Sequence, residues 1–244
     1  MRFVTVASSL SATLLVLLLS GRTISATEPY RVLSPSGDAP HAAVLLVPGC
    51  SGFVATNGIN PYDERAGELQ AAGYIVLFVD YIGRRGMSNC AHVAKTEVAT
   101  DIIEAAIWAR AQSGLDPARI SVIGWSYGGG GVLAALAAMP PGPPTFAKAA
   151  MYYPDCRGAR PWSAAGVTVL MLMGAIDDVA RPAVCDTVVK GAPPNSLRTI
   201  LYPDARHAFD VRSLPERDEQ PFGTIGYNAE AANASWATVL DFLK

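Results

Sequence analysis

One serine of this 244-residue chain lies in a setting that favours nucleophilic chemistry. The segment GWSYG at 124–128 has the G-x-S-x-G spacing, whose two glycines leave room for a sharp turn that exposes the serine hydroxyl. A short apolar run precedes this motif and an alanine-rich stretch follows it, so the motif lies between an expected strand and an expected helix. The same spacing also arises in glycine-rich turns that have no catalytic role. In this setting, we expect Ser126 to be a nucleophile.

The order of the remaining polar residues indicates the partners of this serine. Only one of the chain's three histidines, His207, follows Ser126, and where this motif joins a strand to a helix the catalytic residues follow in the order serine, acid, histidine. A neutral imidazole takes the serine proton and later returns it to the leaving group. Two adjacent carboxylates, Asp177 and Asp178, follow an apolar run and are both candidates for the acid that orients the imidazole. We expect Asp177 in this role with Asp178 in reserve, and three other aspartates as loop or cap residues: Asp155, Asp204 and Asp210.

An anionic intermediate of such a reaction needs backbone N–H donors. Tyr127 follows the nucleophile at the start of the expected helix, where the helix dipole is positive. Cys50 lies in the segment PGCSG at 48–52, directly after a strong apolar run. We therefore expect the backbone N–H groups of Cys50 and Tyr127 to form an oxyanion hole.

The elements that position these residues alternate along the chain. Apolar runs bounded by Gly, Pro or Asp predict strands at 42–47, 74–79, 120–123, 149–153, 167–173 and 197–201. Helical spacing predicts helices at 62–72, 95–112, 127–138, 182–189 and 229–243. This alternation favours an α/β domain with a mostly parallel central sheet flanked by helices. In such sheets the reactive groups lie beyond the carboxyl ends of the strands.

Composition excludes several classes of protein. Half of the residues are hydrophobic, 16% are charged and the net charge is −2, whereas a typical domain has about 25% charged residues. Such a chain is too apolar for intrinsic disorder and lacks the basic excess of a nucleic-acid binder. It has no Cys-x-x-Cys or His-x-x-x-His spacing, which argues against zinc. We also expect no cofactor.

The first 26 residues have the pattern of a secretory signal peptide. A basic start is followed by about ten apolar residues over 10–19 and by small residues before Thr27, and a membrane span would need about 20 apolar residues. An uncleaved anchor is the alternative. We expect residues 27–244 to form a single domain that is secreted or periplasmic and not stably inserted in a membrane after cleavage.

Four segments resemble the dienelactone hydrolase family of α/β-hydrolases, particularly its secreted serine members. They are VLLVPGCSG at 44–52, GWSYGG at 124–129, GAIDD at 174–178 and YPDARHAF at 202–209. The resemblance implies an eight-stranded α/β-hydrolase fold or a trimmed version of it, no metal, and a small ester or lactone substrate. It supports Asp177 over Asp178, because the family has the pattern Gly-x-x-Asp.

The chain also departs from the family's namesake enzymes. Ser126 stands where they have a cysteine, Gly49 where they have a glutamate, and Val211 where they have an arginine. Dienelactone itself is therefore a doubtful substrate. Three arginines, Arg84, Arg85 and Arg206, are candidates to bind an anionic substrate or, equally, to be salt-bridged loop residues. We also expect Trp125, Tyr81 and Arg85 to contact the substrate.

All four cysteines follow the predicted leader, which indicates an oxidising compartment. In an α/β-hydrolase sheet the strands before Cys50 and Cys90 are neighbours, as are those before Cys156 and Cys185. The resemblance thus implies the disulfides Cys50–Cys90 and Cys156–Cys185.

Three functions are consistent with these features. The first is a secreted serine hydrolase that cleaves a carboxylic ester or lactone through an acyl-enzyme. The second is a polyester- or cutin-degrading hydrolase, suggested by the glycine run at 128–131. The third is a non-catalytic binding protein with the same fold.

Overall fold

A seven-stranded sheet forms the centre of the protein. The computed structural model describes residues 29–54, 60–139, 145–163 and 166–244. In spatial order the strands are β1 (Arg31–Leu33), β3 (Ile75–Phe78), β2 (His41–Val47), β4 (Leu115–Trp125), β5 (Lys148–Tyr152), β6 (Thr168–Gly174) and β7 (Leu197–Tyr202). Only the edge strand β1 is antiparallel to its neighbour, and the other pairs are parallel. This is the mostly parallel α/β fold that the sequence predicts.

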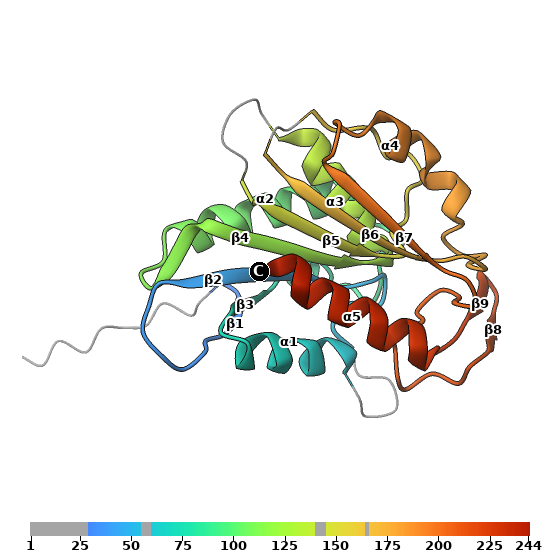
Figure 1. Ribbon diagram of the computed structural model, residues 1–244, viewed down its shortest axis with the longest axis horizontal. Coiled ribbons are helices and arrows are strands. Elements are labelled where there is room, and N and C mark those ends of the chain that lie inside the picture. Colours follow the sequence, from blue (N-terminus) through green and yellow to red (C-terminus); the bar gives the residue numbers. More distant parts are fainter. Residues whose placement is uncertain (1–28, 55–59, 140–144, 164–165) are drawn as a thin grey trace, which may run out of the picture.

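Helices cover both faces of the sheet, as Figure 1 shows. The helices α1 (Pro61–Ala71) and α5 (Ala229–Leu243) lie on one side, and α2 (Lys95–Arg110), α3 (Ser126–Ala138) and α4 (Asp186–Gly191) lie on the other. Alternate residues along β2 therefore enter two separate cores: Leu45 packs with the α2–α3 side, and Leu46 packs with the α1–α5 side. Strands buried on both faces must be continuously apolar, which explains the unalternating runs of the sequence.

Asparagine side chains fix where α1 and α5 begin. The Asn60 side chain accepts hydrogen bonds from the backbone N–H groups of Tyr62 and Asp63, and Asn228 accepts one from Ala231. Both bonds satisfy N–H groups that a helix leaves without an internal partner. The cap at Asn60 also sets the position of Tyr62, which reaches the carboxyl end of β2.

The structure differs from the predicted elements in three places. β4 begins at Leu115, five residues before the predicted strand, because its first half pairs with β2 at His41. The segment predicted as a helix over 182–189 divides into a 3-10 turn (Pro182–Cys185) and α4. The sequence did not predict β1 or the hairpin of β8 (Asp218–Gln220) and β9 (Gly223–Ile225), because strands of three residues have no readable periodicity.

Two disulfides join loops near the carboxyl ends of the strands. They are Cys50–Cys90 and Cys156–Cys185, the pairs that the resemblance implies. Each bond closes a loop of tens of residues and limits the freedom of the unfolded chain. The predicted signal peptide over residues 1–26 lies outside the described residues.

Among the residues that the structure describes, no helix is long and apolar enough to cross a membrane.

The helices α2 and α3 approach each other closely at Gly131. A Cβ atom added there would lie 2.3 Å from Cγ1 and 2.8 Å from Cβ of Val98 on α2. Both residues are buried, so neither helix can move aside without disturbing the core. Gly131, the last residue of the glycine run that follows Ser126, thus serves the contact between two helices.

We expect Gly131→Ala to lower the free energy of unfolding by about 1–3 kcal/mol, because the added methyl overpacks this contact. Gly67→Ala in α1 is the matched control, since an added Cβ there meets nothing within 4 Å. That change should raise the stability by up to about 1 kcal/mol through helix propensity. Urea unfolding of both variants checks the prediction, and equal stability of the two would contradict it.

Candidate active site

A strained turn between β4 and α3 presents Ser126. Its backbone φ is 50°, a left-handed conformation that costs a non-glycine residue about 1–3 kcal/mol. Two residues later, a Cβ on Gly128 would lie only 2.2 Å from the carbonyl oxygen of Pro48. Glycine at 128 thus lets the first turn of α3 lie directly against the loop that follows β2. The hydroxyl of Ser126 is left partly exposed at the carboxyl edge of the sheet.

His207 connects Ser126 to a buried carboxylate. Its Nε2 lies 2.9 Å from Ser126 Oγ, and its Nδ1 lies 2.8 Å from Asp177 Oδ2. The other carboxylate oxygen of Asp177 accepts hydrogen bonds from the backbone N–H groups of Val179 and Ala180, at 2.9 and 2.8 Å. The Asp177 side chain is fully buried. These bonds fix the carboxylate so that it holds the imidazole in one orientation.

Asp178 points away from His207 and serves the β8–β9 hairpin. Its carboxylate accepts hydrogen bonds from the backbone N–H (2.7 Å) and the hydroxyl (3.2 Å) of Thr224. The backbone bond from Thr224 is the main cause that lowers the pKa of Asp178, and the nearby Arg206 charge adds to it. On its other side the hairpin contacts the histidine loop, where Gly226 donates its N–H to the His207 carbonyl at 3.0 Å. The hairpin therefore connects the loop of the acid to the loop of the histidine.

Two tyrosines hold the peptide groups of Gly49 beside Ser126. The Gly49 N–H donates to the Tyr62 hydroxyl oxygen at 2.8 Å, and the Tyr81 hydroxyl donates to the Gly49 carbonyl at 2.9 Å. Burial raises the pKa of both phenols, so they stay neutral. The next residue, Cys50, is fixed by its disulfide and by a 2.9 Å bond from the Cys90 N–H to its carbonyl.

The two expected oxyanion donors remain free of protein acceptors. Within the described part of the chain, the backbone N–H groups of Cys50 and Tyr127 have no hydrogen-bond partner. Both belong to segments that adjoin Ser126, because Gly49 packs against its Cβ and Tyr127 follows it in α3. Two such donors are what an anionic intermediate requires.

A buried aspartate that we expected only in a loop or cap role supports both the serine and the histidine. Asp210 accepts hydrogen bonds from the Trp125 indole at 2.9 Å and from the Tyr153 hydroxyl at 2.5 Å. The Tyr153 ring in turn packs against His207, with ring centroids 4.5 Å apart. The sequence has one signal for this role. Asp210 is a carboxylate three residues after His207, and it lies between the apolar residues Phe209 and Val211.

Asp155, also expected as a loop or cap residue, supports the turn at Ser126. Its backbone N–H donates to the Ser126 carbonyl at 2.9 Å, and its carboxylate forms ion pairs with Lys95 and Arg157. Burial alone would raise the pKa of Asp155, but the hydrogen bonds from Arg157 and Lys95 outweigh burial and lower the pKa to about 2. The carboxylate is therefore ionised in any neutral or mildly acidic medium.

The three residues expected to contact the substrate, Tyr81, Trp125 and Arg85, each have protein partners in the structure. Tyr81 and Trp125 are buried, at 0% and 3% exposure, and their polar atoms are bound to Gly49 and Asp210. Arg85 forms an ion pair with Asp101, as Arg84 does. In these positions the three side chains support the loops around Ser126, and their contact with a substrate stays a prediction.

In the described ranges, no group of three or more His, Cys, Asp and Glu side chains is placed to hold a metal ion.

The fold and this set of residues define an α/β-hydrolase. A profile of the dienelactone hydrolase family matches residues 30–244, and the chain therefore belongs to that family. A search of curated proteins finds no match to this chain.

Solved structures share the fold at low identity. A Klebsiella pneumoniae protein assigned to the dienelactone hydrolases is 20% identical, with a TM-score of 0.65 and coverage of 85% of this chain and 88% of that one. A dienelactone hydrolase-like promiscuous phosphotriesterase from metagenomic libraries is 16% identical, with a TM-score of 0.65 and coverage of 85% and 87%. Thermogutta terrifontis esterase 2 with bound butyrate is 13% identical, with a TM-score of 0.59 and coverage of 87% of both chains.

We expect Tyr62→Phe to destabilise the protein more than Tyr81→Phe. The Tyr62 oxygen is the one acceptor found for the part-buried Gly49 N–H in the described residues, and an unsatisfied donor costs up to about 1–3 kcal/mol when it is fully buried. The Gly49 carbonyl also accepts from the Gly52 N–H at 3.1 Å, so it keeps a partner when Tyr81 loses its hydroxyl. Urea unfolding of both variants measures the difference, and a larger loss in Tyr81→Phe would refute it.

Proposed function

We propose that this protein is a secreted serine hydrolase that cleaves a carboxylic ester or lactone. The observation that carries the proposal is the chain of hydrogen bonds from Ser126 through His207 to Asp177, which starts at a left-handed serine. A serine held in this way is activated by the imidazole, which accepts its proton. Membership of a family of hydrolases supports the same reaction class.

In the first half of the reaction, Ser126 Oγ attacks the carbonyl carbon and His207 Nε2 accepts its proton. The carbonyl oxygen becomes an anion, and the N–H groups of Cys50 and Tyr127 stabilise it. Asp177 stabilises the imidazolium by its charge and keeps its Nδ1 proton directed inward. The tetrahedral intermediate then expels an alkoxide, which takes the proton from His207, and an acyl-enzyme remains on Ser126.

In the second half, water replaces the alcohol. His207 accepts a proton from the water as it attacks the acyl carbon, and the same two N–H groups stabilise the second anionic intermediate. Collapse returns the proton to Ser126 Oγ and releases the carboxylic acid. With a lactone, the alkoxide and the acyl group belong to one molecule, so the product is a hydroxy acid.

Two features support export to an oxidising compartment. The leader pattern over residues 1–26 is that of a signal peptide, and all four cysteines are paired in disulfides. Disulfides persist in secreted and periplasmic proteins and are rare in the cytosol. We therefore place the working enzyme, residues 27–244, outside the cytosol.

Ser126→Ala should lower kcat for p-nitrophenyl acetate by about 10⁴–10⁶-fold, because no other group can form the acyl-enzyme. A fluorophosphonate probe should label the parent protein and Ser88→Ala, a control at an exposed serine, but not Ser126→Ala. Absence of labelling in folded parent protein would instead favour a non-catalytic binding protein.

Asp177→Asn should lower kcat by about 10³–10⁴-fold, because an amide in place of the carboxylate favours the wrong imidazole tautomer. Asp178→Asn should keep kcat within about tenfold of the parent, since that carboxylate contacts Thr224 and not His207. Its effect should fall mainly on thermal stability, measured in parallel. The reverse order of the two kcat values would assign Asp178 as the acid.

A further inference from the structure

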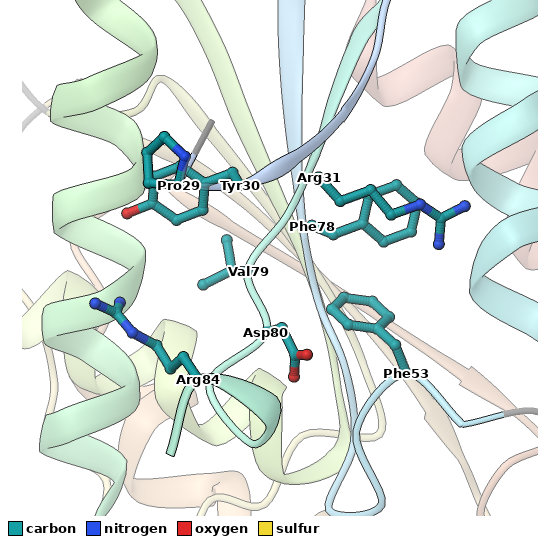
Figure 2. Close-up of a pocket in the computed structure, with 8 residues that line it drawn as sticks. All are labelled: Pro29, Tyr30, Arg31, Phe53, Phe78, Val79, Asp80 and Arg84. Atoms are coloured by element: carbon teal, nitrogen blue, oxygen red, sulfur yellow. The ribbon is translucent and has the colours of Figure 1, made fainter. Parts of the chain in front are cut away.

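A cleft of about 630 Å³ opens at the β1–β3 edge of the sheet. Figure 2 shows it at the carboxyl end of β3, where Phe53, Phe78 and Tyr30 supply its aromatic walls. We call this the edge cleft. None of the residues to which we assign proton transfer or oxyanion binding lines it. The cleft is therefore space at the reactive edge of the sheet that the proposed mechanism leaves unused.

The charges around the edge cleft select against anionic ligands. Arg31 lies over the Phe78 ring at 4.1 Å and pairs with Asp63 at 2.6 Å. Arg84 pairs with Asp101 at 2.8 Å, so neither cation is free. Asp80 accepts a 2.8 Å hydrogen bond from the Gly83 N–H, and it has no cationic partner among the described residues. The remaining charge is negative, so an apolar, neutral group fits these walls best.

A row of aromatic side chains connects the edge cleft to the nucleophile. The ring centroids of Phe78 and Phe53 are 5.1 Å apart, those of Phe53 and Tyr62 are 5.2 Å apart, and those of Tyr62 and Trp125 are 5.1 Å apart. All three pairs meet edge to face, the geometry that aromatic pairs prefer. Trp125 directly precedes Ser126, so ring contacts link the aromatic wall of the cleft, through the buried Trp125 and Phe78, to the residue next to the reactive serine.

The strand order indicates which part of an ester would reach this cleft. Ser126 follows β4, and β3 is two strands away, a separation of about 10 Å at the spacing of neighbouring strands. His207 follows β7, on the opposite side of β4 from β3. The leaving oxygen must face His207 to receive its proton, and the carbonyl oxygen faces the N–H groups of Cys50 and Tyr127. The acyl group takes the remaining direction, and an extended acyl chain that turns toward β3 reaches the edge cleft.

We propose that the edge cleft binds the acyl chain of the substrate, and that the enzyme prefers neutral esters whose acyl chain extends about 10 Å from the carbonyl. This inference rests on the proposed function, because it assigns a substrate class to the same serine. Each methylene that leaves water for such a cleft adds to transition-state binding, so longer acyl chains gain rate until the cleft is filled.

The test compares kcat/KM for p-nitrophenyl acetate, p-nitrophenyl octanoate and the anionic p-nitrophenyl monoester of octanedioic acid. We expect the parent protein to prefer octanoate to acetate by about tenfold or more. Phe53→Ala should lower this octanoate-to-acetate ratio about tenfold, whereas Ile107→Ala, an exposed apolar control on α2, should not change it.

Asp80→Asn should raise kcat/KM for the anionic ester relative to octanoate. If Phe53→Ala does not fold, Phe53→Trp keeps the aromatic row, narrows the cleft and should also lower the ratio.

The outcomes separate the two proposals. If the parent protein hydrolyses none of the esters, the proposed function fails. If it hydrolyses acetate but shows no preference for octanoate, or if Phe53→Ala and Phe53→Trp keep the parental ratio, the cleft assignment is wrong and the proposed function stands. A fall of the ratio in Phe222→Ala, at an exposed phenylalanine beside the acid loop, would move the acyl chain to that side and likewise overturn the cleft assignment.

Discussion

The left-handed backbone of Ser126 is the constraint on which the rest of the site depends. If β4 continued into α3 without this left-handed turn, the serine side chain would lie buried between the helix and the sheet. The turn exposes the side chain instead. The strain is of the order of 1–3 kcal/mol, so the surrounding structure must hold it in place. Three contacts do so. Gly128 lies against the Pro48 carbonyl, Asp155 donates its N–H to the Ser126 carbonyl, and Asp210 anchors the preceding Trp125.

Buried polar groups then fix the loops that face the serine, and each of them has a partner. Tyr62 and Tyr81 satisfy the Gly49 peptide groups, and backbone N–H groups satisfy the oxygen of Asp177 that does not face His207. Hydrogen bonds in such a water-poor interior are strong, and a missing partner would be costly. The same bonds that complete the fold therefore hold the reactive atoms close to their working distances. The disulfide at Cys50 adds a covalent constraint on the loop next to Tyr81.

Sequence reasoning predicted the features whose signal is local. Apolar runs located six of the strands, and the motif at Ser126 together with chain order singled out His207. The roles of Tyr62, Tyr153 and Asp210 had no comparable signal, because they depend on contacts between residues far apart in the chain. Asp210, for example, meets Trp125 across 85 residues. The prediction that Tyr81 and Trp125 contact the substrate used their place in the chain, whereas their burial depends on packing between distant segments that the chain order does not reveal.

Charge pairing explains how a member of this family could come to act on neutral substrates. An arginine binds an anionic ligand well only when no carboxylate already neutralises it. Here Asp101 is buried and pairs with both Arg84 and Arg85, so an anionic substrate would have to displace a buried carboxylate from its partners. Gly49 and Val211 stand where the namesake enzymes have charged residues, so these positions add no charge either. The low charge of the whole chain is therefore matched in this region, where Arg84 and Arg85 hold loops through Asp101 and the walls of the edge cleft are aromatic.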